Sequence, residues 1–321
     1  MERFFAAYRF WLIIISGFVL MNGWAWFLIH QRQHTNDALI KVDQFKSYDE
    51  VNLVILGNSR PACDVVPSVL DSMLKRAGFS FRSYNLAIPG VTSSDIGLLY
   101  KNFVRSRNPK VLLLQTDPEW LELDYEKDAE QRVHRLFLQP WDLIWMFQNS
   151  TVTLEEGLGY AMASVLPLVR YRAEVREWVD NFDFSFWDKS AYESELEEIA
   201  DGGYRALDGT PKEFKEPDEV AEFRLTDPLK VVLRTARAAR KDGIKVFVID
   251  YPHYDYLTSN AYHQQIENFF EREGCVYLDY LSAPVFRDKR LFFDKGHLNQ
   301  KGAELLSKQL AQDLARALKH F

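Results

Sequence analysis

The chain has 321 residues, 47% of them hydrophobic, so it can bury a large core and is neither disordered nor of low complexity. Its formal net charge of -7 and its scattered Lys and Arg residues exclude a basic stripe for phosphate backbones, and we expect no nucleic-acid partner. Two cysteines, Cys63 and Cys275, are too few for a disulfide scaffold or a metal cluster, and whether they form a bridge is left open.

The N-terminus carries the longest apolar run. Residues 10–29 are twenty consecutive positions without a charge, enough for a helix to span roughly 30 Å of hydrocarbon. Trp24 and Trp26 fall near the end of the run, where indole rings favour a membrane interface, and no small-residue cleavage site follows. The sequence predicts a transmembrane anchor at residues 10–29, with a buried core helix as the alternative.

Charges on either side of this run set the expected orientation. Arg3, Arg9 and the terminal amine precede it and Arg32 follows it, so the small excess before it places residues 1–9 in the cytoplasm. The rest of the chain is then expected outside the cytoplasm, in the periplasm or beyond the cell. Residues 30–50 are polar, have mixed charges and lack a strong period, which predicts a tether between bilayer and domain.

From residue 51 to residue 321 short apolar runs alternate with helical patterns. The expected strands are residues 51–56, 84–88, 110–115, 245–250 and 275–278, and the expected helices are residues 67–76, 93–105, 227–241 and 301–318. Near-continuous apolar strands separated by helices predict a parallel sheet covered on both faces. Functional sites in such sheets lie beyond the carboxyl ends of the strands.

Residues 119–219 interrupt this alternation and are expected to form a helical insertion. The segment contains an acidic stretch at residues 193–201 and five of the chain's eight tryptophans: Trp120, Trp141, Trp145, Trp178 and Trp187. Two interpretations stay open. The insertion is either a cap whose aromatic residues form its own core, or a lid or partner-docking surface beside the site.

A serine follows the first expected strand directly, in the sequence Gly57-Asn58-Ser59. Backbone N–H groups at such a strand-to-helix turn can stabilise the oxyanion that forms when a serine attacks an ester carbonyl. Taken alone, Asn and Ser are also common turn and cap residues. The tripeptide therefore indicates a candidate nucleophile only in combination with other residues.

An aspartate and a histidine precede the last expected helix, as Asp294-x-x-His297. A carboxylate at this spacing can orient the imidazole, while the imidazole takes the proton from a serine hydroxyl. An ordinary helix cap is the alternative. Asp250 and His253 follow the fourth expected strand, where they could line the substrate cleft or lie on the surface.

In combination these segments resemble the SGNH (GDSL-like) hydrolases. Members of that family have four sequence blocks in a fixed order: the first contains the nucleophilic serine, the second a glycine, the third an asparagine and the fourth Asp-x-x-His. Gly57-Asn58-Ser59 matches the first block, Gly90 the second and Asp294-x-x-His297 the fourth. The resemblance covers most of residues 51–318 outside the insertion. It implies a three-layer flavodoxin-like α/β fold and a Ser59, His297, Asp294 triad that forms an acyl-enzyme.

The third block departs from the family pattern, because Gln115-Thr116-Asp117 stands where Gly-x-Asn-Asp is expected. Loss of an oxyanion donor lowers the rate by about a hundredfold or more, so either Gln115 substitutes or the backbone N–H groups of Ser59 and Gly90 suffice. We expect Gly90, Gln115, Asp117 and Arg60 near the oxyanion or substrate. Arg60 either holds an anionic substrate or pairs with Asp64.

The altered third block and the N-terminal apolar run are similar to the branch of the family that contains DltD and the alginate O-acetylation proteins. That resemblance implies O-acyl transfer to a cell-envelope polysaccharide, beside a membrane-bound O-acyltransferase as partner. An extracytoplasmic esterase and a non-catalytic adaptor are the alternatives. No cofactor or metal is expected, since phosphate-binding and HExxH-type motifs are missing from the sequence.

Overall fold

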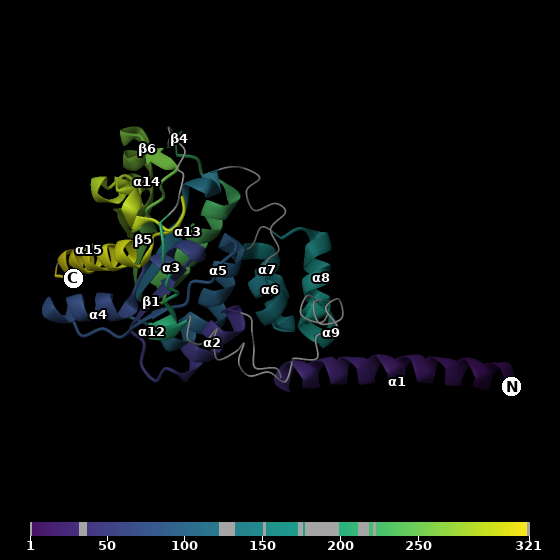
Figure 1. Cartoon of the computed structure of the whole chain (residues 1–321). Coiled ribbons are helices and arrows are strands. Elements are labelled where there is room, and N and C mark those ends of the chain that lie inside the picture. The colour runs from purple at the N-terminus through teal and green to yellow at the C-terminus, as the bar shows by residue number, and fades with distance from the viewer. Residues whose placement is uncertain are drawn as a thin grey trace.

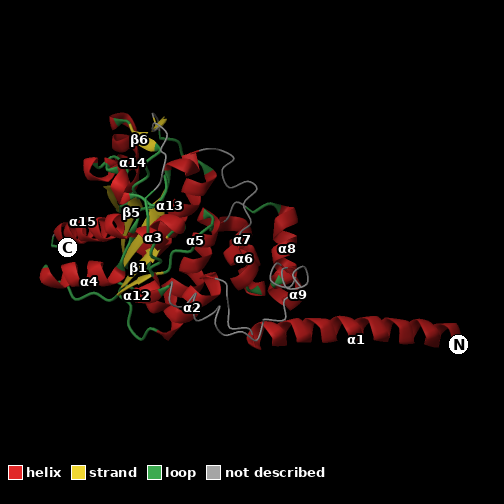
Figure 2. Cartoon of the chain, viewed as in Figure 1, coloured by secondary structure: helices red, strands yellow, loops and turns green. Residues whose placement is uncertain are grey.

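The structure is a computed structural model, shown in Figures 1 and 2. It describes residues 2–31, 37–121, 132–149, 152–172, 176, 199–210, 218–220 and 223–319.

A five-stranded parallel sheet forms the centre of the fold, in the order β2-β1-β3-β5-β7. Its strands are β1 (Leu53–Leu56), β2 (Ser83–Asn85), β3 (Val111–Thr116), β5 (Lys245–Asp250) and β7 (Val276–Asp279). Counting only these five strands, this is the flavodoxin-like order 2-1-3-4-5. The predicted parallel sheet is confirmed. The strand order reverses at β1, which has β2 on one side and β3 on the other, and ligands of such sheets bind at the crevice between β1 and β3.

Helices cover both faces of the sheet, as three layers (Figures 1 and 2). One face carries α5 (Ser93–Leu99), α13 (Asp227–Lys241) and α14 (Asn260–Arg272); the other carries α4 (Pro67–Arg76) and α15 (Gln300–Leu318). The helical pattern of residues 93–105 continues after α5 as a π-turn, η1 (Tyr100–Val104), and a 3-10 turn, η2 (Arg105–Arg107). The expected helices at 67–76 and 227–241 have their predicted bounds.

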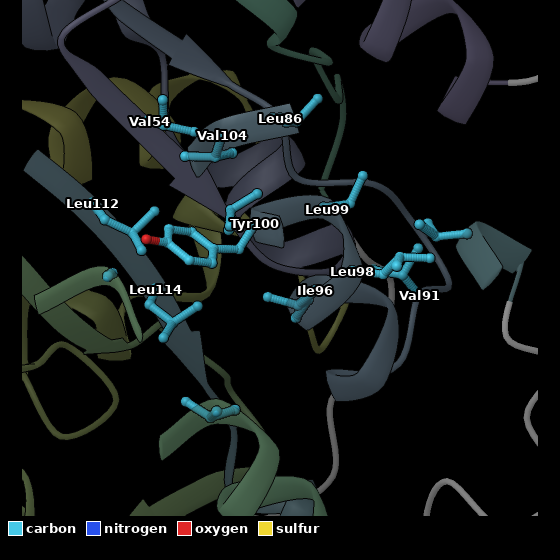
Figure 3. Close-up of a cluster of buried hydrophobic side chains, with 14 of the residues drawn as sticks. Val54, Leu86, Val91, Ile96, Leu98, Leu99, Tyr100, Val104, Leu112 and Leu114 are labelled. Carbon is cyan, nitrogen blue, oxygen red and sulfur yellow. The ribbon is translucent and has the colours of Figure 1, made fainter. Parts of the chain in front are cut away.

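Alternate side chains of each strand enter the two separate cores. Val54 and Leu112 point to the face covered by α5 and α13, whereas Ile55 and Leu113 point to the face covered by α4 and α15. Figure 3 shows the first of these cores, where Ile96 and other residues of α5 pack on the strands. Both faces of every central strand are therefore apolar, which explains the continuous hydrophobic runs of the sequence.

The predicted tether at residues 30–50 is wrong for its second half. Residues Asp37–Ser47 form helix α2, and its apolar side chains, among them Ile40, Val42 and Phe45, are buried. Phe45 packs on Tyr84 of β2 with ring centroids 5.2 Å apart. Because this segment has mixed charges, its sequence did not indicate a helix. The short amphipathic helix belongs to the core, so the folded domain begins before residue 51.

The described part of residues 119–219 is mainly helical, as expected for the insertion. Its elements are η3 (Pro118–Leu121), α6 (Arg132–Phe137), η4 (Pro140–Asp142), α7 (Leu143–Asn149), α8 (Leu154–Val165), α9 (Pro167–Arg170), α12 (Ala200–Gly203) and the short strand β4 (Asp218–Val220). Trp120 is buried in the main core and Trp145 packs against it. Trp178, Trp187 and most of the acidic stretch lie outside the described residues.

Elements that the sequence did not predict complete the fold. They are α3 (Ser59–Asp64), α14, β6 (Tyr256–Thr258), which pairs with β4, and the 3-10 turns η6 (Pro284–Arg287) and η7 (Lys289–Leu291). Cys63 and Cys275 are both free and buried, so the open question of a bridge is answered: they are not paired.

Residues 2–31 form one helix, α1, which projects from the domain (Figure 1). Its large apolar side chains between Trp11 and Phe27 are widely exposed. Within the described residues, no helix meets the combined requirement of length and apolarity for crossing a bilayer. The expected transmembrane anchor at residues 10–29 is therefore not confirmed.

Asp250 lies buried at the end of β5 and accepts hydrogen bonds from the phenols of Tyr262 at 3.1 Å and Tyr277 at 2.6 Å. Burial, together with the charge of Asp279, raises the pKa of Asp250 from 3.8 to about 8. The folded state thus keeps a proton that the unfolded chain releases. The stability that the protonated Asp250 contributes is fully present below pH 3.8 and is lost as the pH rises through about 8.

We expect Asp250→Asn to remove this dependence, because the amide oxygen still accepts from the phenols and does not ionise. The free energy of unfolding of Asp250→Asn minus that of the wild type, both measured by urea denaturation, should increase as the pH rises from 5 to 8.5. Asp43→Asn, at an exposed position of α2, is the control. A difference between Asp250→Asn and wild type that is constant over this range would contradict the expectation.

Candidate active site

The turn after β1 brings Ser59 to the switch point of the sheet. A Cβ atom on Gly57 would lie 2.9 Å from Cβ of Gln115 and would also collide with Pro61. Only glycine therefore allows β3 to approach the turn this closely. The backbone N–H of Asn58 donates to Oε1 of Gln115 at 2.6 Å, so β3 holds the turn through a side chain as well.

Local capping starts α3 at Ser59. The side-chain oxygen of Asn58 accepts the backbone N–H of Arg60 at 3.1 Å, which satisfies one free donor of the first turn. At the other end of α3, the side-chain amide of Asn85 donates to the carbonyls of Pro61 at 2.6 Å and Val65 at 3.0 Å. The short helix that carries the serine is thus held at both ends.

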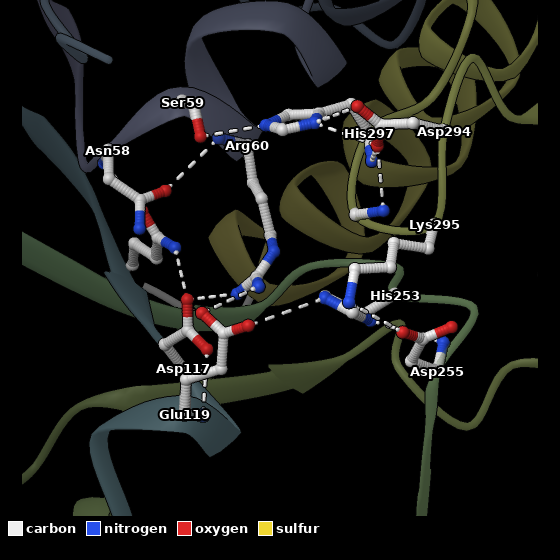
Figure 4. A network of polar contacts seen from close by, with 12 residues as sticks. Asn58, Ser59, Arg60, Asp117, Glu119, His253, Asp255, Asp294, Lys295 and His297 are labelled. Atoms are coloured by element: carbon white, nitrogen blue, oxygen red, sulfur yellow. Dashed lines mark hydrogen bonds and ion pairs between the residues drawn. The ribbon is translucent and has the colours of Figure 1, made fainter. Parts of the chain in front are cut away.

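The loop before α15 places His297 opposite this serine. Nε2 of His297 lies 2.7 Å from Oγ of Ser59, and Nδ1 lies 2.9 Å from both carboxylate oxygens of Asp294 (Figure 4). Asp294 also accepts the backbone N–H groups of Gly296 and His297, each at 2.8 Å. The structure thus brings the three predicted catalytic residues together in one hydrogen-bonded chain.

The charges around His297 tune its basicity. Burial lowers its pKa, but the hydrogen bond and charge of Asp294 and the charge of Asp64 outweigh burial and raise the pKa above 6.5. For Asp294 burial raises the pKa, but the same contact with His297 and the two backbone N–H groups prevail and lower it below 3.8. The arrangement therefore favours an ionised Asp294 beside an imidazole of enhanced basicity.

From the sequence, Asp64 was expected only as an alternative partner of Arg60. It is fully buried behind the site, and its Oδ1 accepts the backbone N–H of Leu298 at 2.9 Å. Burial raises the pKa of Asp64 to about 7. The contact with Leu298 ties α3 to the loop that carries His297.

Three residues expected near the substrate are instead buried under the site. The side-chain amide N–H of Gln115 donates a hydrogen bond to the carboxylate of Asp117 at 3.1 Å, and this carboxylate forms an ion pair with the guanidinium of Arg60. Because Oε1 of Gln115 accepts from Asn58 and Nε2 donates to Asp117, the side-chain amide of Gln115 is directed away from an incoming ester. This position argues against the predicted oxyanion role of Gln115 and against substrate contact by Asp117 and Arg60.

Gly90 follows β2 at the same edge of the sheet. It is exposed, has a φ of 72° that favours glycine, and an added Cβ would meet no atom within 4 Å. Its backbone is therefore open to an approaching molecule, which fits the predicted role better than the contacts of Gln115 do.

A layer of buried and partly buried polar side chains lies beneath the triad (Figure 4). The guanidinium of Arg60 lies 3.1 Å from Glu119, and Nε2 of His253 lies 3.7 Å from the other oxygen of Glu119. Nδ1 of His253 accepts the backbone N–H of Asp255 at 3.2 Å, and burial lowers the pKa of His253. His253 and Asp250 are thus interior residues, which neither line a cleft nor lie on the surface, contrary to both expectations.

Asn299 was not a candidate residue in the sequence, although it anchors the loop that carries His297. Its side-chain amide donates to the carbonyls of Arg290 at 2.9 Å and Gly209 at 3.0 Å, while its oxygen caps α15 at Gly302. The one available signal was its position directly before an expected helix, where Asn is a favoured cap.

Over the ranges that the structure describes, no group of three or more His, Cys, Asp or Glu side chains is arranged to hold a metal ion.

No family model matches the chain, and no curated protein matches it in sequence. Solved structures are similar to it at low identity. A gut microbial diltiazem-metabolizing enzyme is 12% identical with a TM-score of 0.36, and the match covers 83% of this chain but 47% of that enzyme, so the chain spans about half of its length. A Bacteroides fragilis protein described as an acylhydrolase is 10% identical with a TM-score of 0.37, over 86% of this chain and 95% of that protein.

The lipase/acylhydrolase from Enterococcus faecalis is 12% identical with a TM-score of 0.30, over 83% of this chain and 97% of that protein. Because these TM-scores are low, the function proposed below rests on the geometry of the site.

We expect Asp294→Asn to lower kcat/KM for p-nitrophenyl acetate by about a hundredfold or more, since the imidazole loses its orienting carboxylate. In the wild type, activity requires neutral His297 and should rise with pH through a pKa above 6.5. Without the charge of Asp294 this rise should move to lower pH. Asp288→Asn, on an exposed neighbouring turn, is the control, and an unshifted profile in Asp294→Asn would refute the assignment.

We expect Gly57→Ala to lower kcat by about a hundredfold, because the new methyl group displaces the turn that positions Ser59. Gly159→Ala on α8, where a Cβ meets no atom within 4 Å, should leave kcat unchanged. Steady-state kinetics on both purified variants, with circular dichroism to verify folding, make the comparison. Equal kcat values in a folded Gly57→Ala protein and the wild type would contradict the proposed packing constraint.

Proposed function

We propose that the chain is a serine esterase or acyltransferase of SGNH type that works through an acyl-enzyme on Ser59. The observation that carries this proposal is the 2.7 Å contact between Oγ of Ser59 and Nε2 of His297, with Asp294 on the opposite ring nitrogen. A nucleophile, a base within hydrogen-bond reach and a group that orients the base are the components of nucleophilic acyl transfer.

In the first step Ser59 attacks the carbonyl carbon of an ester, and Nε2 of His297 accepts the hydroxyl proton. Asp294 accepts from the Nδ1–H group and stabilises the imidazolium. The oxyanion of the tetrahedral intermediate is assigned to the backbone N–H groups of Ser59 and Gly90, since the amide of Gln115 is engaged. The C–O bond to the leaving alcohol then breaks, and His297 returns the proton to that alcohol.

In the second step a hydroxyl group attacks the acyl-enzyme. His297 removes its proton, the bond from the acyl carbon to Oγ of Ser59 breaks, and the serine regains a proton from His297. Water as acceptor gives hydrolysis, whereas an alcohol gives transfer. The same three residues serve both outcomes, and the acceptor that reaches the site decides between them.

We extend the proposal to the acceptor and the location. The SGNH branch that the sequence resembles implies a hydroxyl of a cell-envelope polysaccharide as acceptor and a membrane-bound O-acyltransferase as partner. The exposed apolar side chains of α1 support association with a lipid bilayer, with the catalytic domain outside the cytoplasm.

Intact-mass analysis after treatment with a fluorophosphonate tests the core of the proposal. The wild type should gain one adduct, Ser59→Ala none, and His297→Ala an adduct that forms at least about a hundredfold more slowly. Ser68→Ala, which removes an exposed serine of α4, should behave as the wild type.

Failure of the wild type to form an adduct that depends on Ser59 and His297 would favour a non-catalytic adaptor. With an adduct established, release of acetate from acetylated glycans without any membrane fraction would identify a free-standing esterase. Acetylation of the polymer only when the membrane fraction is added would identify the transferase.

A further inference from the structure

We propose that helix α8 lies on the surface of a lipid bilayer, with one apolar face in contact with lipid. The inference rests on the membrane association proposed above for α1 and assigns a second, separate contact to the insertion.

One face of α8 is apolar and open to solvent. Leu154, Leu158, Met162 and Val165 are separated by four, four and three positions and therefore share one face. Their side chains are 71%, 60%, 53% and 65% exposed, respectively. The opposite face contributes Tyr160 to the main core. Soluble surfaces seldom leave such a contiguous apolar stripe uncovered.

Exposed apolar side chains continue on the neighbouring elements. Trp141 in η4 and Ile144 in α7 are both highly exposed. Helices α7 and α8 pack closely, since an added Cβ on Gly157 would collide with the ring of Phe147. Exposed apolar side chains of the insertion are thus not confined to α8.

Helix α9 connects this surface to α1. It follows α8 after a single residue, and its Leu168 donates a backbone N–H to the side-chain oxygen of Asn22 in α1 at 3.2 Å. Asn22 is buried, whereas Leu20 and Met21 beside it are exposed. In Figure 1, α8 stands across the direction of α1, next to the C-terminal part of α1, and the part of α1 from its contact with α9 to the N-terminus extends beyond the domain. A bilayer around that part would lie against α8.

The pattern on α1 selects lipid over a protein groove as the occupant. Residues 11–15 are five consecutive exposed apolar residues, and successive residues of a helix point about 100° apart, so these five cover a full turn. Apolar groups therefore surround the helix, and a medium that is apolar in all directions covers them better than a groove that covers one side.

The charges on α8 predict how it binds. Its first turn carries Glu155 and Glu156, so attraction to anionic headgroups is not the driving force. Contact by apolar insertion should occur on neutral lipid and persist at high salt.

Site-specific fluorescence on the full chain, reconstituted in phosphatidylcholine vesicles, tests the inference. Leu158→Cys, Leu20→Cys and Lys308→Cys are each labelled with a nitrobenzoxadiazole dye; Cys63 and Cys275 are buried, which directs the label to the introduced thiol. Lys308 lies exposed on α15 and is the matched control. Nitroxide-labelled phosphatidylcholine should quench most of the emission at positions 158 and 20 and leave position 308 unchanged, with or without 0.5 M salt, which is about three times the physiological ionic strength.

Quenching at position 20 without quenching at position 158 would overturn this inference, leave the role of α1 standing, and point to a protein as the occupant of α8. Loss of quenching at both positions would overturn it together with the proposed membrane association. Fluorophosphonate labelling of Ser59 in the same vesicles reports separately whether the proposed chemistry is intact.

Discussion

The position of the serine depends on how closely β3 approaches the turn that follows β1. Gly57 leaves no room for a methyl group against Gln115, and the side chain of Gln115 replaces a backbone partner for Asn58. From the other side, Ile88 after β2 donates its N–H to the carbonyl of Gly57 at 3.1 Å. The turn is thus held by both neighbouring strands, which gives the nucleophile a rigid base.

The site is built as two layers of different polarity. The upper layer, Asp294 and His297, is partly open to solvent, whereas the lower layer contains the ion pairs of Arg60 with Asp117 and Glu119. Removing one partner of a buried pair typically destabilises a protein by about 3–5 kcal/mol, because the other charge stays buried. The lower layer therefore resists rearrangement beneath the candidate triad.

Sequence reasoning recovered the elements with a strong period. Helices α4 and α13 and strand β5 have their predicted bounds, because each combines an uninterrupted apolar pattern with Pro or Gly signals at its ends. The order of motifs also brought Ser59 and His297 together correctly in space. Helix α2 escaped detection because it is short, and its mixed charges gave it little net hydrophobicity.

The buried charge layer could not be predicted for a different reason. Glu119 and His253 are far apart in sequence, and each resembles an ordinary loop residue until the sheet brings their strand ends together. The sequence also could not decide between Gln115 and the backbone N–H groups as oxyanion donors, for a related reason. Sequence position placed the amide of Gln115 at the correct strand end, but only the packing of the turn determines which atoms the amide meets.

Helix α2 has a consequence for the range over which the proposed enzyme can act. Because α2 belongs to the core and α1 ends at Gln31, only six peptide steps separate Gln31 from Asp37, a distance of at most about 22 Å even when fully extended. If α1 resides in lipid, the serine cannot travel far into the surrounding compartment. Substrates would have to come to the enzyme at the membrane, which favours acceptors that are themselves attached to or growing from that surface.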